Sequence, residues 1–399
     1  MAEFSTSIKS LRSSEIRRLM SLAADPSIIS FTGGMPSNEI FPIDAIDDIW
    51  NGLSRSTKQA AFQYGPTSGY PALVESLKVY LASKGLPVDK SQKLIITTGA
   101  QQALNLITKV FIDPGDRIVT EYPSFIGALA AFKSYGAILK GIPLDNDGIC
   151  IDELKQAITD PWLKPKLLYL SPFFHNPAGI IYSTQRKMDL LELLSGGDIC
   201  LIEDDPYCEL YFDERDRELT RPIKAMALEK FPVCYVGSFA KIFGPGMRLG
   251  WLLGPTEIVD KCELAKQSMD ACSSTFTQVL ANEFLSKNKL PPFVALLRAN
   301  CAKRAQIMLK ALQQEMPPGV SWTSPKGGFY IWVTLPQSVN ASDVFNAAIK
   351  KGAAFVIGSA FDPEEKRNNG FRLAFSFTPE AKIEPGVKII AEAVRSVMA

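Results

Sequence analysis

One lysine and one arginine stand isolated in the segment YVGSFAKIFGPGMRLGW, residues 235–251. The apolar run VCYVG leads into this segment and LGWLLG leads out of it, so Lys241 and Arg248 lie between two strands that we expect to be buried. A lysine amine in such a place can attack an electrophilic carbon, and an arginine can bind an anion such as a phosphate. The glycines form neither the G-x-x-x-x-G-K-[ST] phosphate loop nor the G-x-G-x-x-G dinucleotide fingerprint.

Two further runs end at residues that could meet a flat, anionic ligand. Gly99, Ala100 and Gln101 follow KLIITT and open a helix, where free N–H groups can bind an anion, although an ordinary strand-to-helix turn has the same sequence. Phe125 follows RIVTE and either stacks on a ring or fills the core.

Polar residues also follow the next two runs. Asn176 follows KLLYLS and is either a turn former before Pro177 or a hydrogen-bond donor to a ligand; we expect His175 beside it to be a packing residue. The pair Asp204 and Asp205 follows ICLIE. A carboxylate at the mouth of a buried strand either faces water or meets a cationic ligand group.

Ligands of open α/β sheets bind outside the carboxyl ends of the strands, so these residues are expected to share one site. They would meet a phosphate (Gly99, Ala100, Gln101, Ser238, Arg248), a ring (Phe125), a ring oxygen (Asn176, Tyr207) and a cationic ring nitrogen (Asp204). Pyridoxal 5′-phosphate has all of these groups, and Lys241 would be its Schiff-base partner.

The elements that must position these residues alternate between strands and helices, which predicts a mostly parallel α/β sheet. We expect strands at 93–98, 117–121, 166–171, 199–203, 233–237 and 249–254, with helices at 101–111 and 124–136 among them. After about residue 285 the pattern changes to a long helix, the strands FYIWVTL and FRLAFSF, and a helix around ASDVFNAAIKKG, which together read as a smaller α+β domain. The first forty or so residues hold an expected helix, SEIRRLMSLA, and the loop FTGGMPSNEIFP.

Composition excludes several other classes of protein. Among 399 residues, Lys plus Arg is 43 and Asp plus Glu is 42, so no basic excess points to nucleic acid or an anionic membrane. No apolar stretch is long enough to span a bilayer, and Met1–Leu11 lacks the apolar core of a signal peptide. Seven scattered cysteines without a C-x-x-C pair, and a single histidine, His175, speak against a metal site and favour a reduced, cytoplasmic setting.

The motifs TTGAQQAL, HNPAG, IEDDPY, SFAKIFGPGMRLGW, SPKGGFYIWV and FRLAFSF occur together over nearly the whole chain. In this combination the chain resembles the fold-type I, class I aminotransferases and, within them, the 2-aminoadipate/kynurenine aminotransferase branch. The resemblance implies a mostly parallel, seven-stranded sheet sandwiched by helices, with a smaller α+β domain. It divides the chain into an N-terminal arm with part of the small domain (1–44), a large cofactor-binding domain (45–285) and the rest of the small domain (286–399).

The resemblance also implies roles for residues at matching positions. Lys241 would bind the aldehyde of pyridoxal phosphate and move the proton during catalysis, Asp204 would pair with the pyridinium nitrogen, and Tyr207 and Asn176 would contact the phenolic oxygen. Backbone at Ala100 and Gln101, with Ser238 and Arg248, would hold the phosphate, and Tyr64 would reach the phosphate of a neighbouring subunit, so a homodimer with shared sites is expected. The substrate would meet Arg372 at its α-carboxylate, Gly34 at the pocket wall and Arg17 at its side chain.

The implied activity is the ping-pong transfer of an amino group from an L-amino acid to a 2-oxo acid such as 2-oxoglutarate. Arg17 would suit a distal carboxylate, while Phe31, Phe125, Phe173 and Phe174 would suit a hydrophobic or aromatic side chain. Ala100, Ala240, Phe125 and Ile357 depart from the residues usual in the family, and these departures bear on phosphate binding and substrate preference. Alternatives are a β-lyase with the same cofactor, and a ligand-sensing regulator; the latter is disfavoured because no basic DNA-binding segment precedes the domain.

Overall fold

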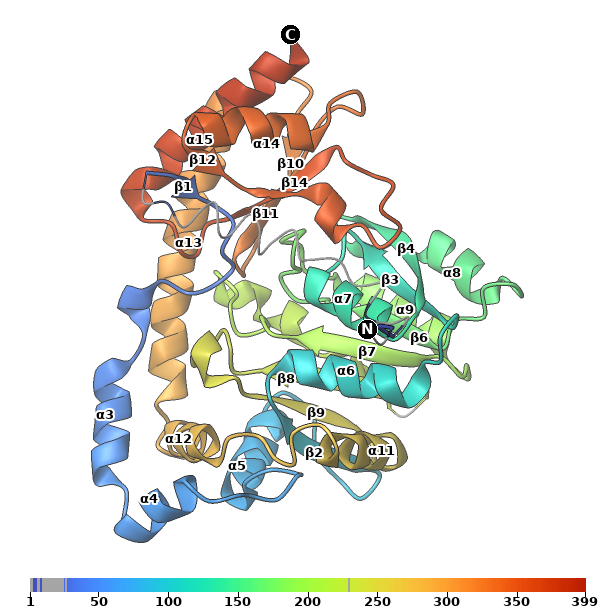
Figure 1. Cartoon of the computed structure of the whole chain (residues 1–399), viewed down its shortest axis with the longest axis vertical. Helices are drawn as coiled ribbons and strands as arrows, with labels where there is room; N and C mark the ends of the chain where they lie inside the picture. Colours follow the sequence, from blue (N-terminus) through green and yellow to red (C-terminus); the bar gives the residue numbers. More distant parts are fainter. Residues whose placement is uncertain (1–2, 6–7, 9–24, 26, 229) are drawn as a thin grey trace.

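The computed structural model describes residues 3–5, 8, 25, 27–228 and 230–399. Arg17 and the helix expected over residues 14–23 lie outside these described residues. The described chain is built on a large α/β sheet, with a smaller antiparallel sheet packed beside it (Figure 1).

The large sheet has the strand order β2-β9-β8-β7-β6-β3-β4-β5. Neighbouring strands are parallel from β8 through β7, β6 and β3 to β4, whereas β9 is antiparallel to both β2 and β8. The strands are β2 (Gln92–Thr97), β3 (Arg117–Tyr122), β4 (Ile138–Asp145), β5 (Gly148–Ile149), β6 (Leu167–Leu170), β7 (Cys200–Asp205), β8 (Val233–Ser238) and β9 (Gly250–Pro255). The expected mostly parallel, seven-stranded sheet is therefore present, and the two-residue β5 extends it by one strand.

Strand β4 did not appear among the strands expected from apolar runs. Its sequence, ILKGIPLD, contains Gly141 and Pro143, and both residue types are depleted in strands. Only its last two residues pair with β5, so most of its outer edge is unpaired within the described chain, which is where a proline is tolerated.

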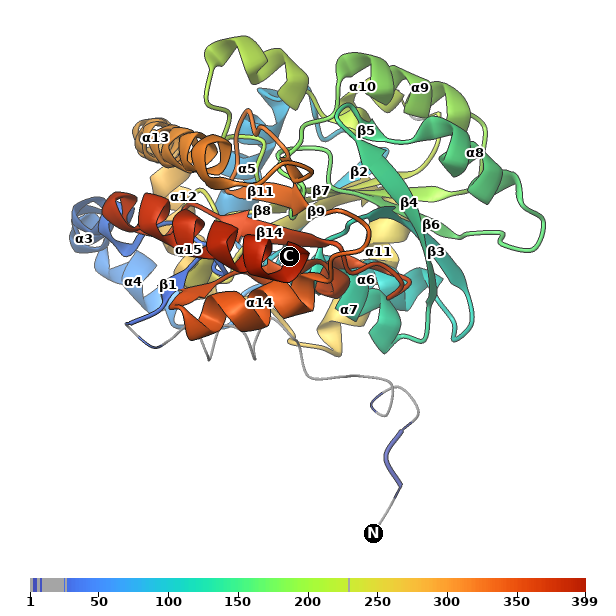
Figure 2. The ribbon, with the colours of Figure 1, turned by 90° about the horizontal axis from the view of Figure 1, so that it is seen from above.

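Helices cover both faces of the large sheet, as Figure 2 shows from above. One face packs against α6 (Ala100–Phe111), α7 (Ile126–Ser134) and α11 (Thr256–Gln267), and the other against α8 (Ile151–Thr159), α9 (Thr184–Leu194) and α10 (Ile223–Ala227). Beyond the β2 edge, α12 (Thr275–Ser286) packs against α3 (Ile43–Gly52), α4 (Arg55–Ala61) and α5 (Pro71–Ala82). None of the helices described is both long and apolar enough to cross a bilayer.

The smaller sheet has the order β10-β11-β14-β13 and is antiparallel. Its strands are β10 (Ser321–Trp322), β11 (Tyr330–Thr334), β13 (Val356–Ile357) and β14 (Gly370–Ala374), and its helices are α13 (Leu290–Glu315), α14 (Ala341–Lys350) and α15 (Glu380–Met398). Near the chain start, β1 (Ile29–Ser30) pairs in parallel with β12 (Ala353–Ala354). Short 3-10 turns are η1 (Asn38–Ile40), η2 (Glu214–Thr220), η3 (Pro245–Met247) and η4 (Gly358–Phe361). The domain boundaries 1–44, 45–285 and 286–399 stay a prediction.

Candidate active site

Lys241 lies three residues beyond the end of β8, and no carboxylate among the described residues pairs with it. Its Nζ donates a hydrogen bond to the carbonyl oxygen of Gly34 at 2.7 Å and lies 5.9 Å from the ring centres of both Tyr207 and Phe329. Burial, together with the positive charges of Arg372 and Arg248, lowers the pKa of Lys241 to about 8. A substantial share of this amine is therefore neutral near physiological pH, as a nucleophile requires.

Gly34 brings the N-terminal loop against the small sheet. A Cβ at this position would lie 1.9 Å from the hydroxyl oxygen of Tyr330, so no other residue fits without moving the tyrosine. The hydroxyl groups of Tyr330 and Tyr207 are 2.8 Å apart and share a hydrogen bond. The loop, β11 and the segment after β7 consequently meet at Lys241.

Asp204 lies at the end of β7 and is almost fully buried, with 2% of its surface exposed. Its Oδ2 accepts a hydrogen bond from the Tyr169 hydroxyl at 2.8 Å, whereas its Oδ1 is buried without a partner in the described chain. The pKa of Asp204 is raised to about 7, mainly by burial; the Tyr169 hydrogen bond opposes this rise, and the charges of Asp205 and Glu121 contribute to it. A buried carboxylate oxygen without a partner is the feature that a cationic ring nitrogen would satisfy.

Asp205, the other member of the acidic pair, faces the opposite side of β7. Its Oδ1 accepts a hydrogen bond from the Cys208 backbone N–H at 2.8 Å, and its Oδ2 accepts one from the Tyr235 hydroxyl at 2.5 Å. Successive side chains of a strand point to opposite faces, so only Asp204 can serve the site.

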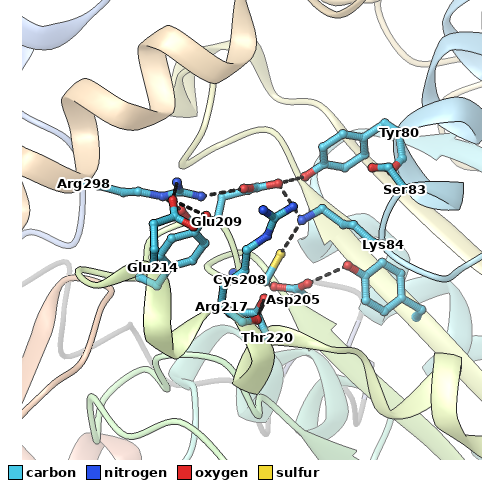
Figure 3. Close-up of polar contacts among 12 residues, drawn as sticks. Tyr80, Ser83, Lys84, Asp205, Cys208, Glu209, Glu214, Arg217, Thr220 and Arg298 are labelled. Atoms are coloured by element: carbon cyan, nitrogen blue, oxygen red, sulfur yellow. Dashed lines mark hydrogen bonds and ion pairs between the residues drawn. The ribbon is translucent and has the colours of Figure 1, made fainter.

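Figure 3 shows Asp205 next to a cluster around Glu209. The Glu209 carboxylate is held by Lys84 at 2.5 Å, by the Tyr80 hydroxyl at 2.8 Å and by Arg298 at 3.1 Å. A cavity of about 1100 Å³ opens here, and none of the predicted site residues lines it. The Glu209 carboxylate is already paired with two cations, Lys84 and Arg298, and it anchors the segment that follows β7. We therefore place the candidate active site on the Asp204 side of the strand.

Arg372 and Asn176 connect the two sheets. Arg372 comes from β14, yet its Nη1 donates to Oδ1 of Asn176 at 2.8 Å, and its Nη2 donates to the carbonyl oxygen of Thr32 at 2.5 Å. The guanidinium lies 4.6 Å from the ring centre of Tyr330, and its Nε is buried without a partner in the described chain. An arginine that keeps free N–H donors in such a pocket is suited to bind a carboxylate.

A buried network lies behind Asn176. His175 accepts a hydrogen bond at Nδ1 from the Ala178 N–H at 3.1 Å, so its Nε2 carries the hydrogen and donates to Glu121 at 3.0 Å. Glu121 also accepts hydrogen bonds from the Ser171 N–H and, at 2.6 Å, from the Tyr182 hydroxyl. His175 is therefore a packing residue within a polar network, as expected, and Glu121 fixes the loop that carries Asn176.

The start of α6 forms the other end of the site. Gly99 precedes the helix with a φ of 77°, and a Cβ there would lie 2.9 Å from Nη2 of Arg248, so the glycine lets the guanidinium approach the helix N-terminus. Ala100 and Gln101 form the first turn, whose N–H groups have no partner within the helix. Ser238 ends β8, and its hydroxyl accepts a hydrogen bond from the Ala240 N–H at 3.1 Å. These groups bring N–H donors and a guanidinium together at a helix N-terminus, an arrangement that suits an anion such as a phosphate.

Most of the aromatic residues expected near the substrate are deeply buried. Phe31, Phe173 and Phe174 are fully buried and belong to the same hydrophobic cluster as Tyr207 and Tyr330. Their expected role beside a substrate side chain stays a prediction. Phe125 is partly exposed at the start of α7, with its ring folded over Gly127.

Tyr64, the residue expected to reach the phosphate of a neighbouring subunit, is 86% exposed on the surface of the chain.

Tyr169, Glu121 and Tyr330 are polar residues around the site that sequence reasoning missed. Tyr169 and Tyr330 lie inside apolar runs, where the pattern gives no sign of a polar role, whereas Glu121 is the last residue of RIVTE and could have been found by the same strand-end rule.

The arrangement fits pyridoxal phosphate on four observations of the structure. It provides an amine with a lowered pKa (Lys241), a buried carboxylate oxygen without a partner (Asp204), an arginine at a helix N-terminus (Arg248) and an aromatic ring near that helix (Phe125). Clusters of three or more His, Cys, Asp or Glu side chains that could hold a metal are absent from the described part of the chain.

Comparisons with known proteins agree with this arrangement. The family model for aminotransferase class I and II matches residues 37–390. The chain is 38% identical to aromatic-amino-acid aminotransferase 1 of Thermococcus litoralis, over 99% of this chain and 94% of that protein. It is 32% identical to 2-aminoadipate transaminase of Thermus thermophilus, over 98% and 96%. The crystal structure of Pyrococcus horikoshii kynurenine aminotransferase, a complex with PMP, gives a TM-score of 0.94 at 38% identity, over 99% of this chain and 98% of that one.

Proposed function

The chain belongs to the class I and II aminotransferases and is a pyridoxal-phosphate-dependent enzyme that transaminates amino acids, and we propose that its donor is a hydrophobic, aromatic or 2-aminoadipate-like L-amino acid. The acceptor is a 2-oxo acid such as 2-oxoglutarate, and the two substrates react in turn at one site in a ping-pong cycle. The observation that carries the proposal is the convergence of a low-pKa amine, Lys241, with the unpartnered oxygen of Asp204 and the free donors of Arg372.

The proposed cofactor contacts are those expected from the sequence and from the family resemblance, and the contacts around Lys241, Asp204 and Arg248 support them. Lys241 Nζ would be the covalent partner of the cofactor's aldehyde carbon, and Asp204 would face its ring nitrogen. The remaining contacts would come from Tyr207 and Asn176 at the ring oxygen, Phe125 at the ring face, and Gly99, Ala100, Gln101, Ser238 and Arg248 at the phosphate. When bound, pyridoxal phosphate supplies an electron sink that stabilises negative charge at the substrate Cα.

Residues of the chain itself would bind the substrate, orient it and move its proton. Arg372 would bind the α-carboxylate through its free N–H donors and so orient the Cα–H bond. Lys241, as a neutral amine, would take the proton from the substrate Cα and hold it, a role that its lowered pKa suits. Asp204, held ionised by a cationic partner, would keep the ring nitrogen protonated. The hydroxyl of Tyr207, shared with Tyr330, would remain neutral because burial raises its pKa well above the ordinary value.

The substrate range is supported by the relatives. Their names give aromatic amino acids, 2-aminoadipate and kynurenine as substrates, and all three carry a large group beyond Cα. Gly34 would form part of the pocket wall, and Arg17, outside the described residues, stays a candidate for a distal carboxylate.

We also propose a homodimer in which Tyr64 of one subunit reaches the phosphate site of the other. Tyr64 is 86% exposed and the nearby Phe62 is 77% exposed, which is unusual for large aromatic residues unless another surface covers them. A cytoplasmic location stays a prediction.

The test is a panel of L-amino acids with and without an acceptor. Phenylalanine, tyrosine, kynurenine, 2-aminoadipate and aspartate are each supplied with 2-oxoglutarate, and glutamate formation is measured. We expect turnover with the first four, and without an acceptor a single equivalent of 2-oxo acid per site. Release of pyruvate and ammonia from a suitable amino acid without any acceptor would instead identify a β-lyase.

A further inference from the structure

Two aspartates in succession on β7 each accept a hydrogen bond from a buried tyrosine hydroxyl. Asp204 accepts from Tyr169 on the neighbouring strand β6, at 2.8 Å. Asp205 accepts from Tyr235 on the neighbouring strand β8, at 2.5 Å. Both tyrosines are buried, with 0% and 1% of their surface exposed.

The two pairs differ in how completely each carboxylate is satisfied. Both oxygens of Asp205 have donors, since Cys208 N–H bonds to Oδ1 and Tyr235 to Oδ2. Asp204 has a donor only at Oδ2, and its Oδ1 is a buried acceptor without a partner among the described residues. The Asp205 pair is thus complete within the protein, whereas the Asp204 pair leaves one oxygen for something else.

From this contrast we propose that Tyr169 is a positioning residue for the cofactor: its hydroxyl fixes Oδ2 of Asp204 and thereby leaves Oδ1 for the pyridinium nitrogen. The proposal rests on the proposed function, because it assigns Asp204 to that nitrogen. Tyr169 is itself held in place, since its ring packs edge-on against Phe132 with ring centres 5.4 Å apart.

The electrostatic surroundings make this single donor important. Glu121 on β3 and Asp205 on β7 both disfavour a charge on Asp204, and burial disfavours it more strongly than either. Tyr169 provides the one hydrogen bond that favours the ionised form. Without it, Asp204 is expected to rotate more freely and to bind a proton up to higher pH, and both effects weaken its pairing with a cationic ring.

The experiment compares Tyr169→Phe with the matched control Tyr235→Phe. Each substitution removes one buried hydroxyl that donates to an aspartate of β7, so a purely structural role predicts similar losses in both. The dissociation constant of pyridoxal phosphate is measured on the holoenzyme by dilution, and the protonation of the ring nitrogen is read from its ¹⁵N chemical shift. Urea unfolding of both apoproteins records the structural cost separately.

We expect Tyr169→Phe to weaken cofactor affinity by roughly ten- to one-hundred-fold, the range that one hydrogen bond to a charged group allows. Its ¹⁵N shift should move toward that of a neutral pyridine, while Tyr235→Phe stays close to wild type in both readouts. Incorporation of 4-aminophenylalanine at position 169, which keeps an N–H donor there, should restore the affinity, and it also serves if Tyr169→Phe does not fold.

Equal affinities and equal ¹⁵N shifts in the two phenylalanine variants would overturn the inference, as would a failure of 4-aminophenylalanine to restore binding in a folded protein. These outcomes differ from failure of the proposed function. In that case the wild-type protein itself would not bind pyridoxal phosphate at Lys241.

Discussion

Replacing Arg372 by lysine keeps a positive charge in the pocket but removes the planar arrangement of donors. A guanidinium has five N–H donors. In the structure one goes to Asn176 Oδ1 at 2.8 Å and one to the Thr32 carbonyl at 2.5 Å, which leaves three, including the unpartnered Nε, for a substrate. An ammonium has three donors, so a lysine that satisfies Asn176 and Thr32 keeps only one for the α-carboxylate.

A carboxylate bound bidentately uses two of the three free guanidinium donors, so the substitution costs one charge-assisted hydrogen bond to the substrate. Such a bond contributes about 1.5–3 kcal/mol, which corresponds to a loss of about 10- to 150-fold in kcat/KM. The assay is the stopped-flow half-reaction of the holoenzyme with an amino acid, followed through the visible absorption of the cofactor. The same measurement with the corresponding decarboxylated amine, which lacks the α-carboxylate, should show little difference between Arg372→Lys and wild type.

Arg304 offers a matched control. It is also buried, donates to the backbone carbonyl of Ser376 and has an Nε without a partner in the described chain. It lies on α13, and its hydrogen bond to Ser376 does not involve a predicted site residue. Arg304→Lys should lower stability without changing kcat/KM beyond about twofold. If Arg372→Lys reduced the rate equally for the amino acid and the decarboxylated amine, the assignment of Arg372 to the α-carboxylate would be refuted.

Two further predictions concern stability. In the native apoprotein the pKa of Lys241 is lowered from 10.5 to about 8, so between these pH values the unfolded chain binds the extra proton. Stability should therefore rise with pH in this window in wild type relative to Lys241→Gln, as measured by urea unfolding; parallel curves would contradict it. Glu121→Gln should lower the free energy of unfolding by about 1–3 kcal/mol, because an amide N–H₂ would face donors that now bond to a carboxylate. The exposed Glu75→Gln should change it by less than about 0.5 kcal/mol, and an equal effect of both would remove the special role of Glu121.

The strand-end rule accounts for much of what could be predicted from the sequence. Lys241, Asp204 and Asn176 each follow an apolar run, and parallel strands bring such ends to one edge of a sheet. The contact between Arg372 and Asn176 spans 196 positions, and no local pattern encodes it. Its prediction came from resemblance to a family rather than from the spacing of residues.

What the sequence could not predict depends on the direction of side chains. Tyr169 lies within an apolar run and Glu121 ends one, so burial is evident but the partner of a hydroxyl or carboxylate is not. Phe173 and Phe174 lie next to the site in sequence, and the pattern does not show that both are fully buried. Strand β4 could not be predicted from the apolar pattern, because it contains a glycine and a proline, which are depleted in strands. They are tolerated here because β4 lies near the edge of the sheet.

The most direct test of the central claim is the attachment of pyridoxal phosphate to Lys241. Purified wild-type protein should be yellow, and borohydride reduction should fix the cofactor on the peptide that contains Lys241, as identified by mass spectrometry. The Lys241→Ala variant should fold, lose the visible absorption of the wild type and carry no label after reduction. An unchanged spectrum in Lys241→Ala, or a label on a different lysine of the wild-type protein, would contradict the account.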